Sequence, residues 1–161
     1  MIQSFNLPVQ HLNDLLKAFE QDVQATAQAS KPKSIEELLQ YCQLSANPVG
    51  RLLLHLYGVK DVEALRRSDA ICSALQLINF WQDLSEDIPR GRFYVPQNLQ
   101  ETMSNTDLVK HLCQHAHGLM MSGAPLVHQI PGRAGWELRG VVQGGLRVLE
   151  KVEKLGPLAF V

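Results

Sequence analysis

Apolar side chains recur every three or four residues along most of the chain, and no segment alternates between polar and apolar positions as a strand would. The spacing predicts helices over about residues 8–29, 61–87, 107–121 and 132–154, with a further helix that begins after Ser34. Ser34 and Glu37 predict a capping box there, and Asp61 is a suitable N-cap for the next helix. Pro48 and Gly50 interrupt the apolar pattern and predict a kink or break. We therefore expect one all-α domain over residues 1–161.

Four polar residues follow one line through the most apolar of these helices. Gln76, Asn79, Asp83 and Asp87 are spaced by three or four residues, which places them on one helix face. We call this set the polar line. Bulky apolar residues surround it, and a helix that is apolar on nearly every side is usually buried. Buried carboxylates need a hydrogen bond, an ion pair or a metal ion, whereas exposed ones meet water. The spacing alone leaves both a cation site and a solvated helix face open.

A basic turn follows the second aspartate. Arg90, Gly91 and Arg92 come directly after Pro89. Mg²⁺ takes oxygen ligands and is often shared between carboxylates and substrate phosphates, and arginine suits bidentate binding of phosphate oxygens. A pair of carboxylates followed by two arginines therefore supplies the groups that a Mg²⁺–diphosphate site needs.

Two tyrosines and a group of small residues are further candidates. The hydroxyls of Tyr41 and Tyr94 could reach a diphosphate or a cationic intermediate, and the alternative is core packing with each hydroxyl hydrogen-bonded. Ser45, Asn47 and Gly50 lie at the predicted kink. Small side chains at a kink either make room for a long apolar substrate or allow two helices to cross closely, and the residues alone leave both roles open.

The whole stretch from Gln76 to Pro96 resembles the second aspartate-rich motif of the squalene/phytoene synthase family. The positions that fall on this motif are Gln76, Asn79, Asp83, Asp87, Gly91, Arg92, Tyr94 and Pro96. Three further segments, residues 41–51, 79–83 and 131–147, resemble the hopanoid-pathway squalene synthase subgroup, the HpnC type. A match of this length is specific, and it covers nearly the whole chain.

The resemblance implies the helical isoprenoid (terpenoid) synthase fold and a reaction on prenyl diphosphates, with Mg²⁺ as the cofactor. For the hopanoid-type subgroup it implies conversion of presqualene diphosphate to hydroxysqualene. Related members condense two farnesyl diphosphates to squalene precursors, or two geranylgeranyl diphosphates in a phytoene synthase-like reaction. The residues that it implicates are Asp83 and Asp87 as catalytic Mg²⁺ ligands, Tyr41 and Tyr94 as catalytic tyrosines, and Gln76, Asn79, Arg92, Ser45, Asn47 and Gly50 as substrate-binding residues.

The resemblance covers only the C-terminal part of the family domain. The family carries a first aspartate-rich motif on an earlier helix. The acids before Gln76 are scattered, and they include Asp14, Asp22, Glu36, Glu37 and Asp61. One expectation is therefore a hopanoid-type enzyme that lacks the N-terminal helices. The other is a non-catalytic helical fragment or interaction module that needs a separate N-terminal half. In both cases we expect exposed apolar helix faces to cause association with that half or self-association.

Composition limits the classes of binding partner and the cellular location that we expect. A net charge of −1 and a pI near 6.6 lack the basic excess of nucleic-acid-binding domains, so we expect no nucleic-acid partner. Three widely spaced cysteines predict reduced thiols and a cytoplasmic location. No segment approaches the ~18 continuous apolar residues of a membrane span, so any contact with a membrane is expected to be peripheral.

Overall fold

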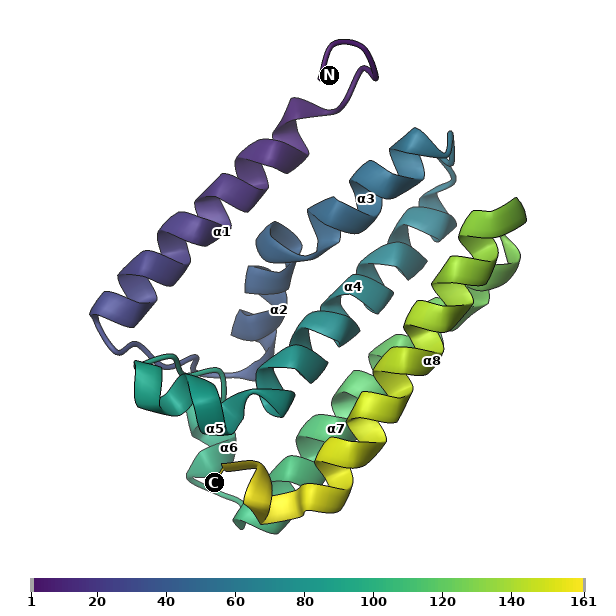
Figure 1. The fold of residues 1–161 in the computed structure, drawn as a ribbon. Coiled ribbons are helices and arrows are strands. Elements are labelled where there is room, and N and C mark those ends of the chain that lie inside the picture. The colour runs from purple at the N-terminus through teal and green to yellow at the C-terminus, as the bar shows by residue number, and fades with distance from the viewer. Residues whose placement is uncertain (1, 161) are drawn as a thin grey trace.

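The computed structural model describes residues 2–160, which form helices and connecting turns without a strand (Figure 1). The α-helices are α1 (Val9–Ala27), α2 (Ile35–Ser45), α3 (Asn47–Leu56), α4 (Val62–Gln82), α5 (Leu84–Asp87), α6 (Gln97–Gln100), α7 (Asn105–Gly123) and α8 (Gly132–Leu155). Short 3₁₀ helices follow α5, α7 and α8, and these are η1 (Ile88–Arg90), η2 (Ala124–His128) and η3 (Gly156–Phe160). The all-α prediction is confirmed.

Helix α4 lies at the centre of the arrangement (Figure 1). It packs against α3 on one side and against α7 and α8 on the other, while α1 packs on α2 and α3. Its buried residues Leu77 and Trp81 share one core cluster with Leu112 and Met120 of α7. Each side chain of this size contributes roughly 1.5–3 kcal/mol when fully buried, so packing on several sides fixes α4 in place.

The predicted break in the second helix is present, but it lies at Ala46 rather than at Pro48 or Gly50. Ala46 has φ −118° and separates α2 from α3. Pro48 occupies the first turn of α3, where its missing N–H costs no helical hydrogen bond. The proline therefore starts a helix here instead of bending one.

Of the two predicted caps, one forms and one differs. The Asp61 carboxylate caps α4 as predicted and accepts a hydrogen bond from the Ala64 N–H at 2.8 Å. At the start of α2 the capping box does not close, because the Ser34 side chain makes no cap bond. The Glu37 carboxylate instead accepts from the N–H of Lys33 at 2.6 Å. The acid reaches one residue past Ser34 and still ties the preceding loop to α2.

The third helix was predicted to continue to Asp87, and it ends instead at Gln82. Asp83 occupies the C-cap with φ −99° and ψ 13°, and α5 and η1 follow. Aspartate has a low helix propensity and Pro89 lacks an N–H, so a helix end in this region agrees with the local sequence. The Asp83 N–H still bonds to the Asn79 carbonyl at 3.0 Å, and the Asp87 N–H bonds to the Asp83 carbonyl at 2.8 Å. The backbone therefore keeps its four-residue step between the aspartates.

Helix α1 has an apolar face that the other described residues leave uncovered. Leu16, Phe19 and Val23 are 60%, 63% and 71% exposed, and Ala18 is the buried residue of this helix. Exposed apolar patches of this kind are typical of surfaces that meet another protein or a membrane. Within residues 2–160, every helix is too short or too polar to cross a membrane.

Candidate active site

The two aspartates lie where α4 passes into α5 and η1 (Figure 1). Asp83 is half-buried, and Asp87 is buried with 8% of its surface exposed. Burial raises the pKa of the Asp87 carboxyl, the Arg92 guanidinium opposes this shift, and the negative charge of Asp83 adds to it. Two carboxylates that repel one another at a partly buried position form a site that a cation would stabilise.

The turn after Asp87 brings Arg92 back beside that aspartate. Gly91 has φ +76°, a left-handed conformation that costs other residues roughly 1–2 kcal/mol. Its N–H bonds to the Ile88 carbonyl at 3.1 Å, and the Arg92 N–H bonds to the Asp87 carbonyl at 3.0 Å, as in a Schellman helix end. The Arg92 guanidinium consequently lies 3.7 Å from the Asp87 carboxylate, and about half of its side chain (51%) remains exposed. The glycine thus sets an arginine against the second aspartate while leaving it free to bind an anion.

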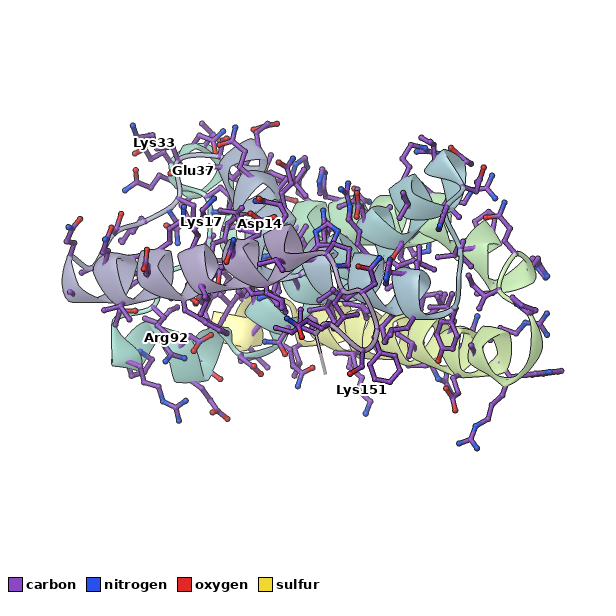
Figure 2. The ribbon with its side chains drawn as sticks, turned by 90° about the horizontal axis from the view of Figure 1, so that it is seen from above. Asp14, Lys17, Lys33, Glu37, Arg92 and Lys151 are labelled. Atoms are coloured by element: carbon purple, nitrogen blue, oxygen red, sulfur yellow. The ribbon has the colours of Figure 1, made fainter. Side chains whose placement is uncertain are left out.

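Helix α1 borders this turn. A Cβ placed on Gly91 would lie 3.9 Å from the Thr26 carbonyl oxygen, so the turn runs close to the C-terminal part of α1. In Figure 2, Arg92 lies on one side of α1, and Lys33 and Glu37 lie on the other. The residues after Arg92 nevertheless run beside the loop that leads into α2, because the Gln97 N–H bonds to the Pro32 carbonyl at 2.9 Å.

The other two members of the polar line lie further back along α4. Gln76 is half-buried and Asn79 is exposed. Of the two possibilities that the spacing leaves open, the solvated helix face fits Asn79, because one side of α4 is open there. The open side leaves the two amide groups accessible to a ligand held at Asp83.

Aromatic rings stack beside the aspartates. Tyr94 lies nearly parallel to Phe80 of α4 with centroids 3.8 Å apart, and Tyr41 of α2 approaches the same ring at 6.0 Å. Burial raises the pKa of Tyr94 to about 12, and the negative charges of Asp22 and Asp87 contribute to the shift. Tyr94 therefore keeps its proton at neutral pH and remains a hydrogen-bond donor.

A third carboxylate reaches the same region from α1. Asp22 accepts a hydrogen bond of 2.7 Å from the Tyr41 hydroxyl. Both residues line a hollow of about 480 Å³ between α1 and α2, which Phe93 and Tyr94 also line. Ser45, one turn after Tyr41, is half-buried. In the sequence, Asp22 is one of several scattered acids, and only the packing of α1 on α2 brings it to a tyrosine.

An apolar hollow of about 350 Å³ runs along the other half of α4, between α3, α4 and α8. The residues that α4 contributes to it are Ser68, Ile71, Cys72 and Leu75. Leu75, Asn79 and Asp83 follow one another in steps of four, so the hollow and the aspartates share one face of α4. The distance from Ser68 to Asp83 along the helix axis is about 22 Å, at 1.5 Å per residue. In the sequence, the small residues near Gly50 are the signal that points to such a hollow.

The small residues at the start of α3 serve packing. A Cβ on Gly50 would collide with the side chains of Ser68 and Cys72, so the crossing of α3 over α4 requires a glycine. Gly50 also lines the apolar hollow. This residue therefore combines the two roles that the sequence leaves open, which are close helix crossing and room for an apolar ligand. Asn47 is buried, and its amide oxygen accepts from the Ser73 hydroxyl at 2.9 Å, a bond that ties α3 to α4.

The fit of this site to Mg²⁺ depends on the number of carboxylates. Within residues 2–160, no three His, Cys, Asp or Glu side chains are grouped so that they could hold a metal ion. Asp83 and Asp87 alone offer two carboxylates. Mg²⁺ often binds through one or two carboxylates and completes its shell with water and phosphate oxygens, so the pair fits this ion when a diphosphate is also present.

Comparison with known proteins places this arrangement in a family. The family model described as Squalene/phytoene synthase matches residues 1–160. The chain belongs to the squalene/phytoene synthase family. Squalene synthase HpnC from Alicyclobacillus acidocaldarius has a similar solved structure, with a TM-score of 0.88 and 31% identity over 96% of this chain and 63% of that chain. The predicted family and its isoprenoid synthase fold are thereby confirmed.

Two curated family members illustrate the range of similar sequences. A hydroxysqualene synthase from Rhodopseudomonas palustris is 28% identical over 169 residues, which cover 95% of this chain and 56% of the relative. A 15-cis-phytoene synthase from Pantoea ananas is 27% identical over 161 residues, covering 91% of this chain and 51% of the relative. The chain spans about half the length of the curated relatives that it matches.

Proposed function

We propose that this chain carries the diphosphate-binding part of an active site that acts on prenyl diphosphates, and that its reaction converts presqualene diphosphate to hydroxysqualene. The observation that carries the proposal is the Asp83–Asp87 pair with Arg92 folded against it, at the end of a helix whose other half lines an apolar hollow. A prenyl diphosphate has an anionic head and an apolar tail. This substrate class therefore matches both parts of the helix face.

The head of the substrate binds at the polar end of α4. Asp83 and Asp87 would hold Mg²⁺, which when bound neutralises diphosphate oxygens and stabilises the charge of the leaving group. The Arg92 guanidinium and the Tyr94 hydroxyl lie near Asp87 and donate to the same oxygens. The amides of the polar line provide further donors on the open side of α4.

The tail of the substrate lies along the apolar hollow. Burial raises the pKa of the Cys72 thiol, so this part of the wall is uncharged at neutral pH. Loss of diphosphate leaves a carbocation, and an apolar wall keeps water away from it until the intended reaction. The stacked rings of Phe80 and Tyr94 offer electron-rich faces that stabilise positive charge near the leaving group.

A condensation of the phytoene synthase type is the second candidate reaction. The match to the 15-cis-phytoene synthase is nearly as close as the match to the hydroxysqualene synthase. Both reactions begin with the loss of diphosphate from a prenyl chain, so the polar end serves either. The chain length that the apolar hollow accepts distinguishes them.

A second role is that of a helical module that works only together with further helices of the family domain. Asp83 and Asp87 are the only two aspartates in the sequence that stand four residues apart. The apolar face formed by Leu16, Phe19 and Val23 is open to a partner. We propose that this face associates with those further helices or with a second copy of the chain.

We also propose a cytoplasmic location with peripheral membrane contact. Cys42, Cys72 and Cys113 are free thiols, which a reducing compartment maintains. An apolar product leaving the hollow would pass most easily into a lipid phase. Co-sedimentation of the purified chain with lipid vesicles tests the membrane contact.

The experiment that tests the proposed function is turnover of presqualene, farnesyl and geranylgeranyl diphosphates with Mg²⁺. Each substrate is given to the chain alone and to the chain mixed with the N-terminal half of a hydroxysqualene synthase. We expect hydroxysqualene and diphosphate from presqualene diphosphate, and condensation of geranylgeranyl diphosphate would favour the second reaction. Diphosphate release that survives Asp83→Asn combined with Asp87→Asn would contradict the metal role. Turnover by the chain alone would contradict the need for further helices.

A further inference from the structure

We propose that Asp22 is a positioning residue for this reaction: its carboxylate accepts the single hydrogen bond that the Tyr41 hydroxyl can donate, so that Tyr41 acts as an acceptor toward the cation and Tyr94 acts as the donor toward diphosphate. The inference rests on the proposed function. It divides between two tyrosines the tasks that the sequence could not separate.

The geometry at Tyr41 carries the first step. A phenol has one proton to donate, and the Tyr41 hydroxyl donates it to Asp22 Oδ2 at 2.7 Å. A hydrogen bond to a carboxylate is about twice as strong as one between neutral groups. As long as this hydrogen bond to Asp22 is made, Tyr41 cannot donate to a diphosphate oxygen, and the lone pairs of its hydroxyl remain available to the hollow that both residues line.

Electrostatics at the same oxygen agree with an acceptor. Burial raises the pKa of Tyr41 well above its usual range, and the hydrogen bond to Asp22 adds to the shift. The Ser45 hydroxyl acts in the opposite direction and lowers the pKa of the phenol, as a donor to this oxygen would. That hydroxyl is buried and has no hydrogen bond of good geometry within residues 2–160. Tyr41 is thus a neutral phenol whose proton points at a carboxylate.

Tyr94 differs from Tyr41 in this respect. Its raised pKa arises from burial and from the charges of Asp22 and Asp87, and no hydrogen-bond partner within residues 2–160 contributes to the shift. Its hydroxyl is near enough to Arg92 for the guanidinium to lower the pKa in part. Tyr94 therefore retains its proton for a ligand at the aspartate end.

The consequence is an ordered arrangement of charge around the substrate. The Asp22 carboxylate accepts the hydrogen bond of the Tyr41 hydroxyl and makes the oxygen and the π-face of this ring more electron-rich, which favours a nearby carbocation. The phenol proton points at the Asp22 carboxylate. Asp22 acts through Tyr41, and it contacts neither the diphosphate nor the reacting carbon.

The first test observes the hydrogen bond directly. The chain has three tyrosines, so tyrosine labelled with ¹³C at Cζ gives three NMR resonances that Tyr→Phe variants assign. Tyr57 is 51% exposed and serves as the internal reference. We expect the Tyr41 resonance to be displaced from that of Tyr57 in the native chain. Asp22→Ala should move it toward Tyr57, and Asp22→Asn, which keeps an acceptor oxygen without the charge, should give a smaller movement.

The matched control is Asp14→Ala. Asp14 lies earlier on α1, where it pairs with Lys17 at 3.8 Å (Figure 2). This variant removes a carboxylate from the same helix and should leave the Tyr41 resonance in place. If Asp22→Ala fails to fold, Asp22→Asn decides the question. A Tyr41 resonance that is unchanged in every folded Asp22 variant would overturn the proposal.

The second test asks whether Asp22 acts through Tyr41 in turnover. Asp22→Ala and Tyr41→Phe should each lower kcat on the order of 10–100-fold, with smaller changes in KM. The double variant should be no slower than the slower single variant. Losses that multiply in the double variant would overturn the positioning role. If the native chain shows no turnover with added N-terminal helices, the proposed function fails, and the NMR result alone decides whether Asp22 sets the Tyr41 proton.

Discussion

The two halves of α4 share one helix face and differ in their physical character. The half from Ser68 to Leu75 lines a hollow that α3 and α8 close with mostly apolar side chains. The other end carries Asn79 and Asp83 and continues into Asp87 within a single stretch of chain. The apolar hollow is thus assembled from three separate helices, of which α8 is distant in sequence from α3 and α4, whereas the polar end is built by local sequence. One helix can in this way present a head site and a tail site to the same elongated ligand.

The two halves also differ in electrostatics. The α4 side chains that line the hollow are uncharged, and burial raises the pKa of the Cys72 thiol among them. At the polar end, burial raises the pKa of Asp87 and so disfavours its charged form, and the negative charge of Asp83 adds to this effect. An unfavourable charge of this kind is typical of functional sites, where a ligand relieves it. Variants at the two ends should therefore fail in different ways.

The largest effect is expected at the polar end. Asp83→Asn combined with Asp87→Asn should lower the Mg²⁺-dependent affinity for inorganic diphosphate by at least about 100-fold, since loss of even a residue that supports a metal ligand typically costs 10–100-fold. Isothermal titration calorimetry with and without Mg²⁺ measures this loss. Glu101→Gln removes an exposed carboxylate elsewhere and should change nothing. Unchanged binding by the double variant would place the cation elsewhere.

A smaller effect is expected at the apolar half, where a variant should weaken binding of the prenyl tail and leave binding of inorganic diphosphate unchanged. Val141 lines the hollow from α8, and Val141→Trp should reduce the space for a prenyl tail without changing the affinity for inorganic diphosphate. Displacing two methylene groups costs about 1.6 kcal/mol, or roughly tenfold in the affinity for a farnesyl diphosphate analogue. The matched control is Val62→Trp, at a position that is 79% exposed and outside the hollow. Equal losses for diphosphate and for the farnesyl analogue would undo the division into head and tail sites.

The polar end could be predicted because its geometry is local. A four-residue step fixes which side chains share a face, and Gly91 marks the left-handed turn that returns Arg92 to Asp87. The bend at Asp83 escaped prediction, since the four-residue hydrogen-bond step continues through it and the apolar spacing does not change. The periodicity of apolar residues predicts which residues share a helix face, but it does not predict a small bend in the helix axis.

The apolar hollow and the Asp22–Tyr41 bond could not be predicted in the same way. The hollow places Leu75 of α4 beside Val141 of α8, and a single sequence contains no signal for which distant helices pack together. Asp22 is an unremarkable acid on an amphipathic helix until α1 packs on α2 and sets it 2.7 Å from the Tyr41 hydroxyl. The resemblance to a family supplied the class of substrate. The contacts that would refine a mechanism required the fold.

The turn that joins the two aspartates to Arg92 offers a test on stability. Gly91→Ala should lower the free energy of unfolding by about 1–2 kcal/mol, because a Cβ is disfavoured at φ +76°. Loss of the turn should also weaken diphosphate binding a few-fold by displacing Arg92. Gly140→Ala is the control, since Gly140 lies inside α8 with open space around it and the change should stabilise the helix by about 0.5–1 kcal/mol. Urea unfolding of both variants gives the comparison, and equal stabilities would show that the turn does not depend on glycine.

The smallest effect concerns pH and again separates the two ends of α4. The pKa of Asp87 is raised in the folded protein, so the fold binds this proton more tightly than the unfolded chain does. The resulting contribution to stability is complete below the unfolded pKa, near 3.9, and is lost as the pH rises through the higher folded value. Asp87→Asn should therefore be more stable than the native chain at neutral pH and should lose that advantage in acid. Thermal melting from about pH 3.5 to pH 7 measures the gap. Addition of Mg²⁺ and diphosphate at pH 7 should also reduce this difference in stability, because it should stabilise the native chain and leave Asp87→Asn unchanged. A difference in stability that is constant across pH would contradict the electrostatic origin.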